Sequence, residues 1–192
     1  DFGVYLGEKT GAGEKERVLL PKKQVPEGTG EGDVLTVFIY KDSSDRLIAT
    51  TREPVAELGQ LAVLKVAAVG KIGAFLDWGL EKDLFLPFKE QTKRVHEGQE
   101  CLVALYADKS DRLCATMKVY HYLKKNSPYI IGDEVTGRVY DISDTFGVFV
   151  AVDNPYSGLI PKREARREYK VGDAFHRSVH KLKDDGTHDQ SK

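Results

Sequence analysis

The stretch YKDSSDRLIAT at residues 40–50 returns as YADKSDRLCAT at residues 106–116, 66 residues later. Most positions are identical, and in both copies an Asp- and Ser-rich turn leads into an apolar run. Self-similarity at a fixed spacing is the sequence signature of repeated structural units. The chain therefore contains at least two copies of one fold.

Other anchors recur in the same order and reveal a third copy. Each copy starts with a glycine between apolar residues, continues with an apolar pair and a proline, and then reaches a glycine followed by a polar residue. The glycine motifs are FGVYL at 2–6, IGAFL at 72–76 and FGVFV at 146–150, and the proline motifs end at Pro21, Pro87 and Pro161. We predict three units, at residues 1–52, 58–118 and 130–192.

The second unit defines the fold class. Its short apolar or alternating runs, bounded by Gly and Asp turns, indicate five β-strands, at residues 61–69, 73–78, 84–86, 100–106 and 113–117. Residues 87–97 have room for a helical turn. Five strands with a short helix after the third are typical of an OB-fold barrel. We therefore predict an all-β protein of three tandem OB-fold barrels, of which the first lacks its first strand and the last is truncated in its fifth.

The two joints between units differ in length. Residues 51–58 form a short link, which predicts close packing of the first two units. Residues 118–131 form a longer one, in which Val119, Tyr120, Tyr122 and Leu123 can make one face of a helix. The second joint is therefore interpreted as a hinge or a helical spacer.

The composition excludes several classes of protein. The net charge is −1 and 41% of residues are hydrophobic, values typical of a folded domain. No apolar run is long enough for a membrane helix, and no signal peptide opens the chain. Two cysteines fit a reducing cytosol. We expect a cytoplasmic protein, without a membrane partner, that is part of a longer chain because it does not begin with Met.

A search for catalytic or cofactor motifs finds none. The chain has no nucleophile elbow, P-loop, zinc-protease motif or paired-cysteine motif. His176 and His180 have metal-ligand spacing only on a helix, but they fall in a predicted strand and are interpreted as surface residues. Cys101 and Cys114 are interpreted as buried thiols rather than a redox pair. We expect no enzyme activity, no cofactor, no metal and no small-molecule substrate.

Aromatic residues cluster around the repeated glycines. An aromatic residue or Ile precedes each glycine and an aromatic follows two residues later; the pairs are Phe2 with Tyr5, Ile72 with Phe75, and Phe146 with Phe149. A bend at the glycine lets both side chains share one face. Exposed rings on an OB barrel stack on unpaired bases. The alternative is that one ring of each pair belongs to the core.

Charged residues add two further candidate groups. Asp42 and Arg46 lie four apart at the turn before the last strand, as do Asp108 and Arg112. Such an Arg can bind phosphate or stack on a base while the Asp orients it. The third unit has instead a cluster of cations after Pro161, namely Lys162, Arg163, Arg166 and Arg167. The alternatives are a solvated ion pair and a solvated helix face.

Taken together, these motifs resemble the S1 motif, the RNA-binding OB repeat of ribosomal protein S1. The third unit shows it best, in GDEVTGRV at 132–139, FGVFV at 146–150 and GLIP at 158–161. Proline stands where the general motif has His, at Pro21, Pro87 and Pro161. Three such units are similar to the bacterial CvfB (conserved virulence factor B) family, whose members carry three S1-like domains and a winged helix and regulate gene expression by binding RNA.

The resemblance implies which residues contact RNA. The aromatic platform would be Phe146, Phe149 and Phe75, with Tyr5 and Phe2 in the same places of the first unit. The pairs Asp42–Arg46 and Asp108–Arg112 would occupy the corresponding positions in the turn before the last strand. Ile72 cannot stack as a ring does, and the His that resembling proteins use for one base contact is missing from all three units.

These observations favour a module that binds single-stranded RNA in post-transcriptional or virulence gene regulation. The alternative is a protein-interaction scaffold of degenerate repeats that docks the ribosome or RNA-processing proteins. Residues 1–57 carry a net charge of −3, residues 58–127 of +3 and residues 128–192 of −1. We therefore expect the main RNA contact on the second and third units.

Overall fold

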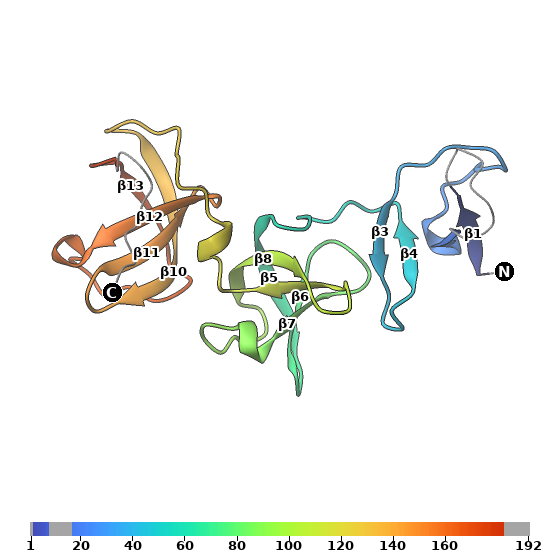
Figure 1. The fold of residues 1–192 in the computed structure, drawn as a ribbon, viewed down its shortest axis with the longest axis horizontal. Coiled ribbons are helices and arrows are strands. Elements are labelled where there is room, and N and C mark those ends of the chain that lie inside the picture. Colours follow the sequence, from blue (N-terminus) through green and yellow to red (C-terminus); the bar gives the residue numbers. More distant parts are fainter. Residues whose placement is uncertain (1, 8–16, 183–192) are drawn as a thin grey trace.

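The computed structural model describes residues 2–7 and 17–182. These residues form thirteen strands and four short 3₁₀ helices, without an α-helix in the described ranges. Figure 1 shows the strands gathered in three groups in a row, with the N-terminal unit at one end and the C-terminal unit at the other. Among the described residues no helix is long and apolar enough to cross a membrane. The all-β class predicted from the sequence is confirmed.

The second unit is a closed barrel with strand order β5-β6-β7-β9-β8. Its strands are β5 (Leu61–Val69), β6 (Gly73–Asp77), β7 (Leu84–Pro87), β8 (Glu100–Ala107) and β9 (Leu113–Thr116). A 3₁₀ helix, η2 (Phe88–Glu90), follows the third strand. The five strands and the position of the helical turn confirm the OB-fold predicted for this unit.

Alternation along the strands explains how the barrel core is filled. Cys101, Val103 and Leu105 of β8 point inward and are at most 2% exposed. They meet the inward residues of β5, where Leu64 pairs with Cys101. Side chains two apart on a strand share a face, so these three residues of β8 fill the core together.

The flanking units repeat this topology with one strand fewer among the described residues. The first unit has strands β1 (Gly3–Leu6), β2 (Val18–Pro21), β3 (Phe38–Lys41) and β4 (Leu47–Thr50). Its order, β1-β2-β4-β3, matches β6-β7-β9-β8. The counterpart of β5 is absent from the described part of this unit. In keeping with that gap, Ile39 is 48% exposed, whereas Leu105, its counterpart 66 residues later, is 0% exposed.

The third unit contains a counterpart of β5. Its strands are β10 (Glu134–Ser143), β11 (Gly147–Val152), β12 (Tyr156–Pro161) and β13 (Ala174–Ser178). The order β12-β11-β10-β13 matches β7-β6-β5-β8. The fifth strand expected from the sequence falls on residues 183–192, outside the described residues. The 3₁₀ helices η1 (Lys22–Gln24) and η4 (Lys162–Glu164) follow β2 and β12 as η2 follows β7.

The repeated glycine is required by a close approach of two strands. In every unit it opens the strand that pairs with the proline-ending strand. A Cβ added at Gly3, Gly73 or Gly147 would lie 2.1, 2.4 or 2.2 Å from the carbonyl oxygen of the residue before that proline. No side chain fits at that distance, so the three glycines fix the same contact in each unit.

Aromatic rings close the joint between the first and second units. The Trp78 ring is 3% exposed and lies against Phe38 and Tyr40 of β3, with ring centroids 6.0 and 6.4 Å apart. The Val55 N–H of the link donates to the Trp78 carbonyl at 2.9 Å. The short link thus holds the two units in direct contact.

The second joint is packed differently from what the sequence predicts. Leu102 and Ala104, on the outer face of β8, form a buried cluster with Val119 and Leu123 of the link and with Tyr140 of the third unit. The expected helical face is wrong, because only η3 (Tyr120–Tyr122), a single 3₁₀ turn, forms there.

The backbone of the link is used by the third unit instead. The Lys124 N–H donates to the Pro155 carbonyl at 2.6 Å, and Lys124 bridges to Tyr156 in parallel. Residues held in an extended bridge cannot continue a helix, and the apolar side chains of the link are buried between the two barrels.

Replacing Gly73 by Ala should strongly destabilise the second unit. The new Cβ would meet the Leu86 carbonyl at 2.4 Å, and that carbonyl cannot move without disturbing the β6–β7 pairing. We expect the free energy of unfolding to fall by about 3 kcal/mol or more, measured by urea denaturation followed by circular dichroism.

The matched control is Gly98→Ala. Gly98 has a left-handed φ of +82° but open space around its Cβ position. Its substitution should cost about 1 kcal/mol, from backbone strain alone. Equal costs at the two positions would contradict the close-contact explanation.

Candidate nucleic-acid interface

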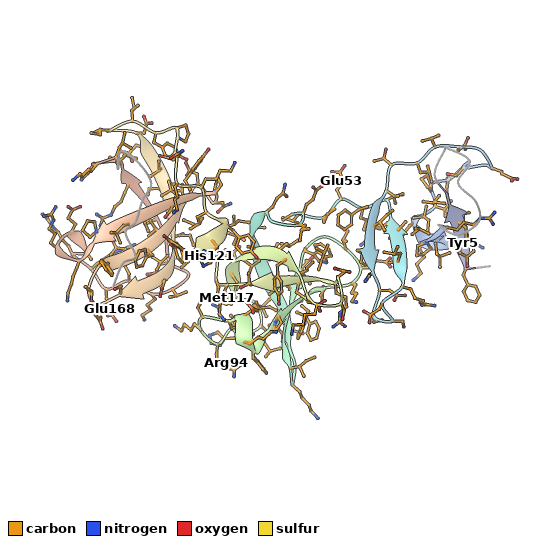
Figure 2. All side chains as sticks on the ribbon, viewed as in Figure 1. Tyr5, Glu53, Arg94, Met117, His121 and Glu168 are labelled. Carbon is orange, nitrogen blue, oxygen red and sulfur yellow. The ribbon has the colours of Figure 1, made fainter. Side chains whose placement is uncertain are left out.

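The first unit exposes both of its candidate rings. Phe2 precedes Gly3 and is 87% exposed, and Tyr5 on β1 is 66% exposed. Figure 2 shows the Tyr5 ring directed away from the unit at the end of the molecule. Neither ring is used in the core, so both are accessible to a stacking partner.

The third unit brings its two candidate rings together. The centroids of Phe146 and Phe149 lie 6.5 Å apart with an angle of 58° between the rings. Phe146 is 60% exposed, while Phe149 is half-buried and lies 6.2 Å from Tyr140 in the second joint. Phe146 is therefore the exposed ring of the pair (the open ring), and Phe149 lies against both Phe146 and Tyr140 of the second joint.

The second unit has a ring pair that the repeat pattern alone does not reveal. Phe75 pairs across the strands with Phe85, and their centroids lie 5.5 Å apart. Phe85 in turn pairs with Cys114 of β9, so one row of side chains crosses three strands on the outside of the barrel. A sequence signal for it exists in the proline motif, where the second unit has Phe85 and the other units have Leu19 and Leu159.

The Asp–Arg pair of the first unit is built into its turn. One Asp42 carboxylate oxygen accepts the backbone N–H groups of Ser44 and Arg46, and the other accepts the Arg46 guanidinium at 2.9–3.0 Å. Hydrogen bonds from Arg46 and Ser44 hold the pKa of Asp42 below its ordinary value. Asp45 takes a φ of 59°, which Asp tolerates.

The second unit repeats this turn. Asp108 accepts the N–H groups of Ser110 and Arg112 at 2.8 and 3.1 Å and pairs with the Arg112 side chain at 3.1 Å. Burial acts to raise the pKa of Asp108, but the hydrogen bonds from Arg112 and Ser110 outweigh it, and the pKa is lowered. Each Asp therefore shapes the turn and aims an Arg whose side chain is 77% (Arg46) or 45% (Arg112) exposed.

The two turns also contact one another. Arg112 lies 3.5 Å from an Asp45 carboxylate oxygen, and the Lys41 ammonium donates to the Ser110 carbonyl at 2.6 Å. The candidate Arg side chains of the first two units thus share one edge of the molecule. No sequence signal predicts this, because the contact joins residues more than 60 positions apart.

The cation cluster of the third unit lies next to its open ring. The Lys162 N–H donates to the Phe146 carbonyl at 3.1 Å, and its ammonium donates to the Asp144 carbonyl at 2.7 Å. Arg163 lies 3.6 Å from Glu164. All four cations are exposed, and Arg167 covers the Tyr169 ring at 4.6 Å. The expected helix face is limited to η4, so Arg166 and Arg167 leave it in non-helical backbone.

The described residues contain no candidate metal centre. No group of three or more His, Cys, Asp or Glu side chains within 2–7 and 17–182 has metal-binding geometry. Cys101 and Cys114 are free and buried, and burial raises the pKa of each thiol to about 11. His176 is exposed on β13 and lies 3.3 Å from the Thr136 hydroxyl. The raised pKa values favour the protonated form of both thiols at neutral pH.

Comparison with known families agrees with this geometry. Residues 1–52 and 58–118 match the family described as S1 domain, and residues 129–189 match the S1 RNA binding domain. A multidomain protein with nucleic acid binding domains from Streptococcus pneumoniae TIGR4 has a similar solved structure, with a TM-score of 0.57 at 22% identity. The similarity covers 93% of this chain and 67% of that chain, and it shows a shared fold.

Two curated relatives extend the similarity over most of the chain. Protein YitL of Bacillus subtilis (strain 168) is 27% identical over 97% of this chain, and conserved virulence factor B of Staphylococcus saprophyticus is 21% identical over 74%. The matches span 64% and 50% of those proteins, so this chain corresponds to part of their length. The chain belongs to the S1-domain family, as a tandem-S1 protein similar to conserved virulence factor B.

Proposed function

We propose that the chain binds single-stranded RNA by stacking bases on exposed rings and neutralising backbone phosphates with neighbouring cations, in the regulation of gene expression. The observation that carries the proposal is the third unit, where the Lys162 backbone N–H donates to the carbonyl of Phe146, whose ring is exposed. A base stacked on that ring would place its phosphate beside the cation cluster of residues 162–167.

The second and third units are proposed as the main RNA-binding units. The second unit offers the Phe75–Phe85 pair and the exposed Arg112, and the third offers Phe146 and its cations. The first unit has exposed rings, but residues 1–57 carry a net charge of −3, which repels phosphate. Its contribution should therefore be smaller.

We also propose that the chain has no hydrolase or transferase activity of its own. The sequence contains no catalytic motif, and the two free cysteines are buried. Substrate-dependent turnover that persists through rigorous purification would contradict this.

Phe146→Ala should weaken binding of a single-stranded RNA homopolymer by about 1–3 kcal/mol, at low and at moderate salt alike. Stacking is not a charge interaction, so the loss should not depend on salt. Filter binding at two salt concentrations measures it. The matched control is Tyr5→Ala, which removes an exposed ring from the first unit and should cost less. A larger effect of Tyr5→Ala, with both variants folded, would place the primary site on the first unit.

Removing cations should have a different signature. Arg163→Ala with Arg166→Ala should flatten the dependence of log K on log salt by roughly 0.7 for each phosphate that the variant no longer neutralises. The control, Lys23→Ala with Arg52→Ala, removes two exposed cations from the first unit and its link and should leave the slope nearly unchanged. Equal slopes for all three proteins would argue against phosphate binding by the third unit and favour a protein-docking scaffold.

A further inference from the structure

Each unit contains one pair of hydrogen-bonded residues beside the start of the strand that the repeated glycine opens. The residue after the proline donates its backbone N–H to the carbonyl of the residue before the glycine. The donor–acceptor pairs are Lys22 to Phe2 at 3.1 Å, Phe88 to Ile72 at 3.4 Å and Lys162 to Phe146 at 3.1 Å. The two positions are therefore equivalent in the three units and adjacent in space.

The second unit has different residue types at this pair. The first and third units place the ring before the glycine and a lysine after the proline. The second unit has the aliphatic Ile72 before Gly73 and the aromatic Phe88 after Pro87. The second unit thus keeps a ring at this place but supplies it from the other strand.

A cation accompanies the relocated ring. The Arg94 guanidinium carbon lies 3.9 Å from the centroid of the Phe88 ring, within the range of a cation–π contact. Arg94 is exposed, and Figure 2 shows it at the outer edge of the second unit. Every unit therefore has one ring and one nearby cation at this place, although the second unit takes both from different sequence positions.

Core packing does not account for the Phe88 ring. Phe88 is half-buried, and within the described residues it neither belongs to a buried hydrophobic cluster nor packs against one. Its backbone, by contrast, is firmly held. The Gln91 N–H donates to the Phe88 carbonyl, and the Met117 N–H donates to the Glu90 carbonyl, which ties η2 to the barrel.

The segment that carries Arg94 is anchored as well. Val95, the next residue, is 7% exposed and belongs to the barrel core. A ring and a guanidinium held by rigid backbone at the surface lose little freedom when a planar ligand stacks on them. Arg side chains and aromatic rings are both stacking partners for unpaired bases.

We propose that the Phe88–Arg94 pair is a base-stacking position of the second unit and replaces the ring absent at Ile72. The ligand is an unpaired nucleotide, whose base stacks on the pair and whose phosphate is neutralised by Arg94. This inference rests on the proposed RNA-binding function and adds a contact to it that the repeat pattern alone does not contain.

The test measures binding of the full chain to a fluorescent single-stranded oligouridylate by anisotropy. Phe88→Leu keeps an apolar side chain and removes the ring, and it should weaken binding by about 5- to 150-fold. Phe88→Tyr keeps a ring and should bind within a few-fold of the original chain. Arg94→Ala removes an exposed guanidinium and should also weaken binding.

A relocation variant tests the equivalence of the positions directly. Ile72→Phe with Phe88→Lys gives the second unit the arrangement of the other two, and it should bind much more tightly than Phe88→Leu. If this folded double variant binds no better than Phe88→Leu, the equivalence is refuted.

The outcomes also separate this inference from the proposed function. Unchanged binding by Phe88→Leu and Arg94→Ala, together with weaker binding by Phe146→Ala, would overturn the inference and leave the proposed function standing. Unchanged binding by all three would overturn the inference and the stacking role of Phe146, and failure of the unaltered chain to bind the oligouridylate would overturn the proposed function itself. Thermal unfolding of each variant identifies misfolding, and if Phe88→Leu does not fold, Arg94→Ala decides between these outcomes.

Discussion

A contact between a glycine and a carbonyl oxygen sets the geometry of all three units. At Gly3, Gly73 and Gly147 a Cβ would lie within 2.4 Å of the opposing oxygen, so the two strands approach at a distance that any side chain would prevent. That approach brings the residue before the glycine into hydrogen-bond contact with the residue after the proline. Phe146, Lys162 and Phe88 occupy these positions, so this part of the candidate interface follows from the same constraint that closes the strand pair.

The joints use another part of the barrel. Both involve the outer face of the fourth strand of the preceding unit, with Phe38 and Tyr40 of β3 at the first joint and Leu102 and Ala104 of β8 at the second. Because β3 and β8 are corresponding strands, the units are linked through the same face twice. Two of the strands that carry candidate rings reach a joint. Trp78 of the first joint directly follows β6, and Phe149 of β11 packs at the second joint.

Much of this architecture is visible in the sequence, and the reasons for the exceptions are physical. The repeat of residues 40–50 at 106–116 predicts the shared fold, and the alternating and apolar runs of the second unit predict its five strands. Both signals are local and periodic. The helical prediction for the second link is wrong because its apolar residues fit a helical period, while their partners lie on two separate barrels.

Contacts between residues far apart in the sequence are the other feature that the sequence does not predict. The meeting of Arg112 with Asp45 depends on how two barrels dock, which no local pattern encodes. The relocation of a ring from position 72 to Phe88 is likewise hidden from a column-by-column comparison, because the two residues lie on different strands and are equivalent only in space. The candidate site could thus be predicted by residue type, but its full membership required the strand pairing.

Trp78 gives the molecule a spectroscopic property of its own. It is the chain's single tryptophan, and its ring is buried where the first unit meets the second. Its fluorescence emission therefore depends on the docking of β3 and on the integrity of the second barrel, but not directly on the third. Far-ultraviolet circular dichroism, by contrast, sums over all strands. The difference between the unfolding midpoints measured by fluorescence and by circular dichroism therefore reports how independently the third unit unfolds.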